Sequence, residues 1–167
     1  MKFYIVAIVS LILDQVTKFL ILNRFSNKPA GYSESIIGDF FCFTFVKNEG
    51  GAFGVKLIMS PWAVLISSVF IFCLLTYYII KKEKSPMLMY GLPLILGGAA
   101  GNLIDRMRFG YVIDFLDFRV WPVFNIADIT ITAGVIMVIF YLLFSSPEAK
   151  STKTSPISTE VDKPVES

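Results

Sequence analysis

The groups in this sequence that could do chemistry are aspartates, lysines and amides, because the chain contains no histidine. Without an imidazole there is no Ser–His or Cys–His nucleophile pair and no HExxH zinc site. Hydrolysis would therefore depend on carboxylates, lysine or a metal ion held by oxygen atoms. Asp128 is the carboxylate most in need of an explanation. It falls in the first turn of an apolar segment, where a charge is costly in lipid and usually marks a function.

Other polar residues stand inside or beside apolar segments too. Asp14 and Lys18 are four residues apart, so they could equally form an ion pair on one helix face. Asp105 and Arg106 could equally mark a helix end that meets water. Taken singly, each has an ordinary structural explanation. The full set of candidates is Asp14, Lys18, Asn48, Asn102, Asp105, Arg106, Asp114, Asn125 and Asp128.

Four apolar segments must carry these residues, at 3–22, 61–80, 87–104 and 126–144. Each is close to the roughly 20 residues that cross a bilayer. The composition agrees, since 55% of the chain is hydrophobic and only 17% is charged. A net charge of +2 without a continuous basic stripe argues against nucleic acid as a partner.

The connectors set the orientation. Residues 81–84 hold three lysines, which predicts that this short loop faces the cytoplasm. With four spans, both termini are then cytoplasmic, and the connectors 23–60 and 105–125 face outward. The candidate polar residues all fall at the outer face under this topology. The inner halves of the spans stay apolar.

The local patterns add detail to this topology. Alternation of Phe41, Phe43 and Phe45 with smaller residues predicts a strand in the first outer connector. Gly97 and Gly101 form a small-xxx-small pattern that permits close helix contact. The tail 145–167 is polar and is predicted to be disordered. The expected fold is an all-α membrane protein with four transmembrane helices and a small extracytoplasmic β-rich cradle.

Five motifs resemble those of one family, in order along the chain. Residues 14–18 (DQVTK) resemble DQxTK, and residues 48–54 (NEGGAFG) resemble an NxGAAFG-type segment. Residues 97–106 (GGAAGNLIDR), 112–115 (VIDF) and 124–128 (FNIAD) resemble GGAxGNxxDR, VxDF and FNxAD. The family is the lipoprotein signal peptidases, also called signal peptidase II. One departure is Gly51, where the family more often has alanine.

The resemblance implies an aspartic endopeptidase of the bacterial inner membrane. Such an enzyme removes the signal peptide of a prolipoprotein, cutting before a cysteine that carries diacylglycerol. It implies a peptidase domain over 1–144 with the cradle at about 23–60, and a cytoplasmic tail over 145–167. It also implies a monomer without cofactor or metal, which meets lipid-modified prolipoproteins and membrane lipids. Carried over residue by residue, Asp114 and Asp128 are the catalytic pair. The site support is Asp14, Lys18, Asn48, Gly50, Asn102, Arg106 and Asn125.

Two neighbouring carboxyls suffice for peptide hydrolysis. Like charges in contact do not ionise together easily, so one proton is shared and one apparent pKa rises. One partner activates water and the other polarises the carbonyl. Asp114 and Asp128 are fourteen residues apart, however, so the fold must bring them together.

Three other functions stay open at this point. A small transporter or channel would also place charges in the membrane, although its polar residues should extend across it. A lipid transferase with carboxylate-bound Mg²⁺ would need several close acidic groups, and Asp114 and Asp117 are the nearest pair. A purely structural role would leave the polar layer without a purpose.

Overall fold

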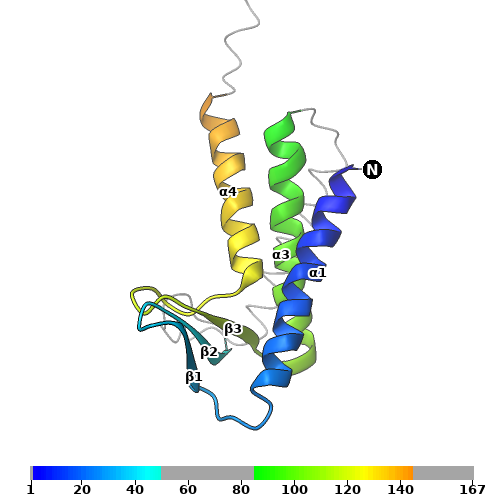
Figure 1. Cartoon of the computed structure of the whole chain (residues 1–167). Coiled ribbons are helices and arrows are strands. Elements are labelled where there is room, and N and C mark those ends of the chain that lie inside the picture. Colours follow the sequence, from blue (N-terminus) through cyan, green and yellow to red (C-terminus); the bar gives the residue numbers. More distant parts are fainter. Residues whose placement is uncertain (1, 50–84, 145–167) are drawn as a thin grey trace, which may run out of the picture.

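The computed structural model describes residues 2–49 and 85–144. This part of the chain forms long helices above a small sheet (Figure 1). The predicted span at 61–80, Gly50, Gly51 and the tail 145–167 lie outside the described residues. The elements in chain order are α1 (Lys2–Arg24), β1 (Ser33–Ile37), β2 (Phe41–Asn48), α3 (Pro86–Phe109), β3 (Val112–Asp117) and α4 (Ile126–Phe144).

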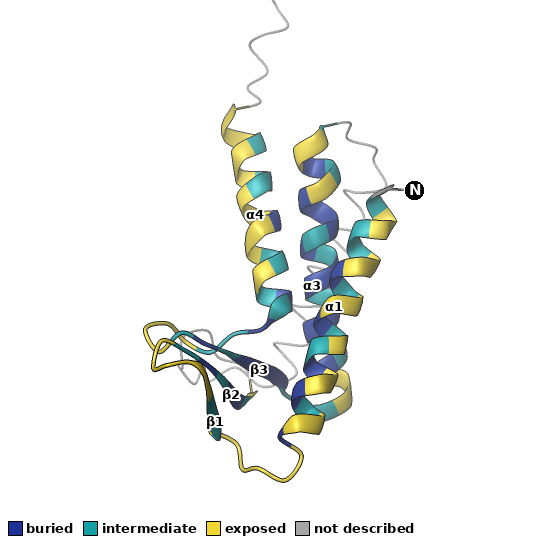
Figure 2. Cartoon of the chain, viewed as in Figure 1, coloured by how far each residue is buried: buried dark blue, intermediate teal, exposed yellow. Residues whose placement is uncertain are grey.

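The three helices in the described ranges are each long and apolar enough to cross a membrane. Figure 2 shows exposed residues along α1 and α4, and many of these residues are large and apolar. Ile12 and Phe19 on α1 and Phe140 on α4 are all more than half exposed. Such faces are unfavourable in water and suit lipid. The predicted membrane-type fold with a small sheet is therefore confirmed, with the fourth span outside the described ranges.

Helix α3 ends at Phe109, five residues beyond the predicted segment. Pro86 starts it at a position where the missing N–H costs nothing. Gly110 ends it in the left-handed conformation, with φ 80°, and its N–H bonds the carbonyl oxygen of Arg106 at 3.0 Å. This turn feeds the chain directly into β3.

Small residues let the helices approach closely, as the small-xxx-small pattern of Gly97 and Gly101 predicted. A Cβ at Gly97 would lie 2.5 Å from the carbonyl oxygen of Ala7 on α1, and one at Gly101 would collide with Asp14. Gly98 faces the opposite way, because its Cβ would meet the carbonyl oxygen of Ala127 on α4 at 2.5 Å. The helix α3 therefore packs against α1 on one side and α4 on the other.

The sheet is antiparallel in the order β1-β2-β3. The alternation of Phe41, Phe43 and Phe45 predicted a strand, and β2 confirms it. The connector 105–125 was expected to be a loop at Asp114, which is wrong, because Asp114 lies in β3 and pairs with Val46. The register shifts between Phe43 and Val46, so Thr44 and Phe45 are both buried. That irregularity explains why strict alternation fails there.

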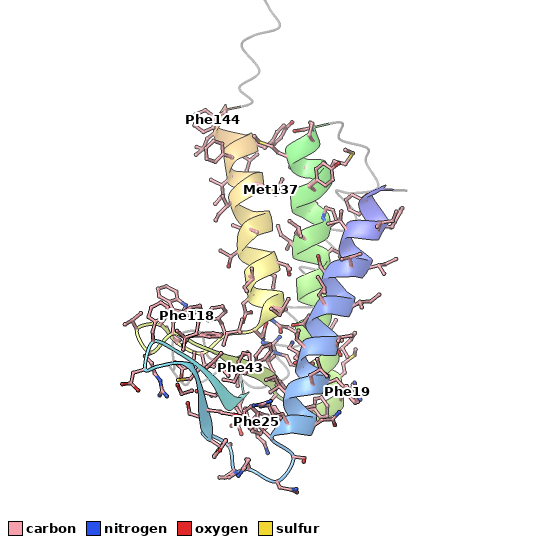
Figure 3. The ribbon with its side chains drawn as sticks, in the orientation of Figure 1. Phe19, Phe25, Phe43, Phe118, Met137 and Phe144 are labelled. Atoms are coloured by element: carbon pink, nitrogen blue, oxygen red, sulfur yellow. The ribbon has the colours of Figure 1, made fainter. Side chains whose placement is uncertain are left out.

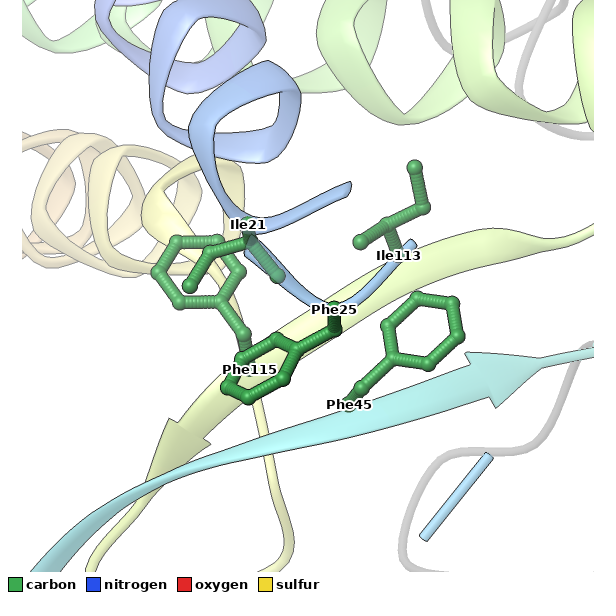
Figure 4. Close-up of a cluster of buried hydrophobic side chains, with 5 residues drawn as sticks. All are labelled: Ile21, Phe25, Phe45, Ile113 and Phe115. Atoms are coloured by element: carbon green, nitrogen blue, oxygen red, sulfur yellow. The ribbon is translucent and has the colours of Figure 1, made fainter. Parts of the chain in front are cut away.

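A hydrophobic cluster attaches the sheet to α1. It consists of Ile21, Phe25, Phe45, Ile113 and Phe115, all of which are buried (Figure 4). Figure 3 places Phe25 where the chain leaves α1 toward the sheet, at the end of the molecule opposite to Phe144. The cluster fixes β3 relative to α1, and thereby fixes the strand that carries Asp114.

Gly134→Ala should destabilise the protein by about 1–3 kcal/mol, since overpacking a tight contact costs that much. The added Cβ would lie 2.5 Å from the carbonyl oxygen of Gly91 on α3. Chemical or thermal unfolding in detergent measures the change. Ala133→Val, on the exposed face of the same helix, is the matched control and should unfold like the parent. Equal stability of Gly134→Ala and the parent would contradict this packing.

Candidate active site

A buried ion cluster lies between α1 and α3. The Lys18 ammonium lies 2.9 Å from Asp14 Oδ2 and 2.8 Å from Asp105 Oδ2. The three side chains are 2%, 0% and 1% exposed, respectively. Gln15 adds hydrogen bonds from Nε2 to both carboxylates, at 3.2 and 3.1 Å. A buried charge needs such pairing, because it has lost its hydration.

The cluster connects to Asp128 through an amide. Lys18 Nζ donates to Asn102 Oδ1 at 2.9 Å, and Asn102 Nδ2 donates to Asp128 Oδ1 at 3.0 Å. Asn102 lies on α3, one turn before Arg106. The close packing of α3 against α4 brings Asn102 to the start of α4. The neutral Asn102 amide therefore orients the Asp128 carboxylate relative to Lys18 without adding a charge of its own beside it.

Asn125 and Asp128 form a reciprocal cap at the start of α4. Asp128 N–H donates to Asn125 Oδ1 at 3.0 Å, while Asn125 N–H donates to Asp128 Oδ2 at 3.1 Å. This is the capping-box arrangement, which satisfies donors that a helix start leaves without partners. It also holds the Asp128 carboxylate in one orientation. Asn125 and Asp128 are three residues apart, which is the spacing that such a cap requires.

Asn125 reaches Asp114 with its other end. Its Nδ2 donates to Asp114 Oδ1 at 2.6 Å, and Asn48 Nδ2 donates to Asp114 Oδ2 at 2.8 Å. Burial raises the pKa of the Asp114 carboxyl, the hydrogen bonds from Asn48 and Asn125 lower it, and the nearby Asp128 charge raises it. The resulting pKa is about 7. Asp114 is therefore able to hold a proton near neutral pH.

The fold thus brings most of the predicted site residues into one hydrogen-bonded network. Its members are Asp14, Lys18, Asn48, Asn102, Asp114, Asn125 and Asp128. Arg106 lies at its edge, where its Nη1 donates to its own helix at Asn102 O, 3.4 Å away. It lies close enough to Asp114 and Asp128 for Coulombic attraction. Gly50 lies outside the described residues.

Two members of the network, the buried Asp105 and the half-buried Gln15, were missed or misread in the sequence. Asp105 is not a helix end meeting water, as one reading had it, because it pairs with Lys18 inside the protein. Gln15 stood in a matched motif but received no role, and it bridges both carboxylates of the ion cluster. The signal for Gln15 was its position between Asp14 and Lys18, one residue from the ion pair.

Asp117, the other acidic residue of β3, belongs to a different cluster. It accepts hydrogen bonds from Thr44 Oγ1 at 2.6 Å and Arg119 N at 2.8 Å. Residues three apart on a strand point to opposite faces, so Asp114 and Asp117 do not converge. The geometry that a carboxylate-bound Mg²⁺ would need from this pair is therefore not formed.

Comparison with known proteins gives one consistent family. The family model described as signal peptidase (SPase) II matches residues 6–144. A lipoprotein signal peptidase from Halothermothrix orenii is 45% identical over 139 residues, which cover 83% of this chain and 93% of that protein. One from Moorella thermoacetica is 42% identical over 148 residues, with 89% and 97% covered.

Solved structures agree with the sequence comparison. A bacterial membrane enzyme determined by the in meso method at 2.3 Å superposes with a TM-score of 0.80 and 31% identity, covering 92% of this chain and 94% of its own. A second such enzyme, at 1.9 Å, gives a TM-score of 0.76 and 33% identity, with coverage of 87% and 94%.

Lys18→Met should destabilise the protein by about 3–5 kcal/mol, because it leaves two buried carboxylates without their cation. Unfolding in detergent measures the loss. Arg24→Met is the matched control, since it removes the exposed ion pair with Glu34 and should change stability little. If both variants unfold alike, the buried cluster does not have the structural weight assigned to it.

Proposed function

This chain belongs to the signal peptidase II family, and from that membership we propose which residues perform its reaction. The protein is a bacterial inner-membrane protease that removes the signal peptide from prolipoproteins. Its catalytic pair is Asp114 and Asp128. Cleavage falls before a cysteine that carries diacylglycerol, whose acyl chains stay in lipid while the peptide backbone reaches the site.

The observation that carries this proposal is that Asn125 forms hydrogen bonds with both Asp114 and Asp128. The same residue bonds Asp114 through its side chain and Asp128 through its backbone and its side-chain oxygen. Asp114 and Asp128, fourteen residues apart in the chain, are thereby linked through one residue. Neutral amides from Asn48 and Asn102 occupy the remaining carboxylate oxygens.

Protonation divides the work between the two carboxyls. Asp114 keeps the shared proton, because burial and the nearby Asp128 raise its pKa to about 7. It donates this proton to the scissile carbonyl oxygen. Asp128 accepts a proton from the attacking water and passes it to the leaving amine. When the tetrahedral intermediate collapses, the proton on its oxygen returns to Asp114, so the pair regains its starting state.

The supporting residues act through contacts rather than chemistry. Asn102 orients Asp128, and Asn48 orients Asp114. The Arg106 guanidinium is suited to a substrate carbonyl or a lipid oxygen, because its own bond to α3 is long. Lys18 stabilises the network through its hydrogen bond to Asn102, and Asp14 through the bond that it accepts from Ala127 N–H. Gly50 completes the set that the family motif assigns to substrate contact.

We further propose the arrangement in the membrane. Residues 61–80 form a fourth span, both termini are cytoplasmic, and the site lies at the outer face of the inner membrane. The support is that the polar network occupies only the sheet end of α1, α3 and α4, while many exposed side chains along α1 and α4 are large and apolar. The chain works as a monomer with a peptidase domain over 1–144 and a disordered cytoplasmic tail over 145–167.

Asp114→Asn and Asp128→Asn should each abolish cleavage of a diacylglyceryl-modified precursor while the protein still inserts in the membrane. Each change removes one proton-transferring group and keeps the side-chain size. The assay is the mobility shift of the precursor with purified enzyme in detergent. Asp39→Asn, on the turn between β1 and β2, is the matched control and should cleave normally. Full processing by either dyad variant would defeat the assignment.

Activity should fall as pH rises above about 7, because the Asp114 carboxyl then loses the proton that the reaction needs. Asn48→Ala removes a hydrogen bond that lowers this pKa. The alkaline limb of kcat should therefore move to higher pH in that variant. A pH series with the lipid-modified precursor measures the alkaline limb of the parent and of the variant. An alkaline limb at the same pH in parent and variant would speak against Asp114 as the proton donor.

A further inference from the structure

Two backbone N–H groups next to the catalytic pair bond the ion cluster. Ile113 N–H donates to Asp105 Oδ2 at 3.1 Å, and Ala127 N–H donates to Asp14 Oδ1 at 2.9 Å. Ile113 directly precedes Asp114, and Ala127 directly precedes Asp128. The two carboxylates that flank Lys18 thus each hold the chain one residue before a member of the pair.

Both N–H groups lie at positions where regular structure supplies few partners. β3 is the last strand of the sheet, and within the described residues the bridge on its other side joins Leu116 to Phe124, so Ile113 N–H has no strand partner there. Ala127 lies in the first turn of α4, where N–H groups have no partner within the helix. A carboxylate from another helix satisfies each of them. These contacts fix where the strand and the helix begin relative to α1 and α3.

We propose that the Asp14–Lys18–Asp105 cluster is a spacer that sets the separation of the two catalytic carboxyls. Asp105 is the positioning residue for Asp114, and Asp14 is the positioning residue for Asp128. Lys18 joins the two arms, because its ammonium contacts both carboxylates within 2.9 Å. The spacer rests on the proposed function of the pair.

The spacer acts on the chemistry because a shared proton and one water need a fixed gap. A displacement of about 1 Å at a reacting group can cost on the order of 100-fold in rate. Every oxygen of the two arms is used. Asp105 Oδ1 accepts from Gln15, and its Oδ2 accepts from Ile113 and pairs with Lys18. An asparagine at that position has only one acceptor oxygen, so it loses at least one of these contacts.

Hydrogen–deuterium exchange of the full chain in detergent separates the two arms. Asp105→Asn should speed exchange at residues 112–117 and leave residues 126–129 as protected as in the parent. Asp14→Asn should do the reverse. Glu34→Gln, which breaks only the exposed pair with Arg24, is the matched control and should change neither segment. Faster exchange of both segments in both single variants would overturn the two-arm spacer.

Kinetics supply the second readout. Each arm variant should lower kcat for the lipid-modified precursor by roughly 100-fold, with KM unchanged, because substrate binding does not involve the buried cluster. If an arm variant does not accumulate, Gln15→Met replaces it. That change keeps every charge and removes one hydrogen bond from each carboxylate, so a smaller fall in kcat at constant KM is expected. A raised KM with normal kcat would overturn the proposal.

The outcome also separates the spacer from the catalytic assignment. Dead Asp114→Asn and Asp128→Asn variants, beside arm variants with parental kcat, would leave the pair intact and refute the spacer. Active Asp114→Asn or Asp128→Asn would refute the pair itself, whatever the exchange pattern shows.

Discussion

The buried ammonium of Lys18 is the constraint on which the rest of the site depends. A cation that is 2% exposed has lost its water, and the desolvation penalty of several kcal/mol must be offset by charges and hydrogen bonds. Asp14 comes from the same helix, but Asp105 and Asn102 come from α3. The charge can be satisfied only when α1 and α3 pack in one register. That register then places β3 and the start of α4.

The glycines of α3 make that register possible. Gly101 leaves the space that the Asp14 carboxylate occupies, and Gly98 leaves space for the first turn of α4. Larger residues would separate the helices beyond hydrogen-bonding distance. Among the described residues, no buried side-chain nitrogen or oxygen lacks a partner. Close packing and polar satisfaction therefore require each other here, since the polar groups meet only because the backbones approach.

The sequence predicted the parts of this arrangement that depend on local pattern. Apolar length located α1, α3 and α4, alternation located β2, and span parity placed the polar residues at one depth. It could not predict that Asp114 lies on a strand, because 112–117 is a short mixed segment whose partner, β2, is more than 60 residues away. The fate of Asp105 was equally hidden. A carboxylate at a helix end reads as solvated until the partner helix is known to bring Lys18 to it.

The protonation of the proposed catalytic pair, Asp114 and Asp128, depends on which groups touch the two carboxyls. The donors that bond Asp114 are the neutral amides of Asn48 and Asn125. Asn102 stands between the Lys18 ammonium and Asp128 and bonds both. A lysine in direct contact would favour the charged form of its carboxylate and would drive the shared proton away. The Asn102 amide instead links Lys18 to Asp128 through two hydrogen bonds, without direct contact between the ammonium and that carboxylate. A buried ion cluster and a carboxyl that can hold a proton near neutral pH, Asp114, can therefore coexist in one hydrogen-bonded network.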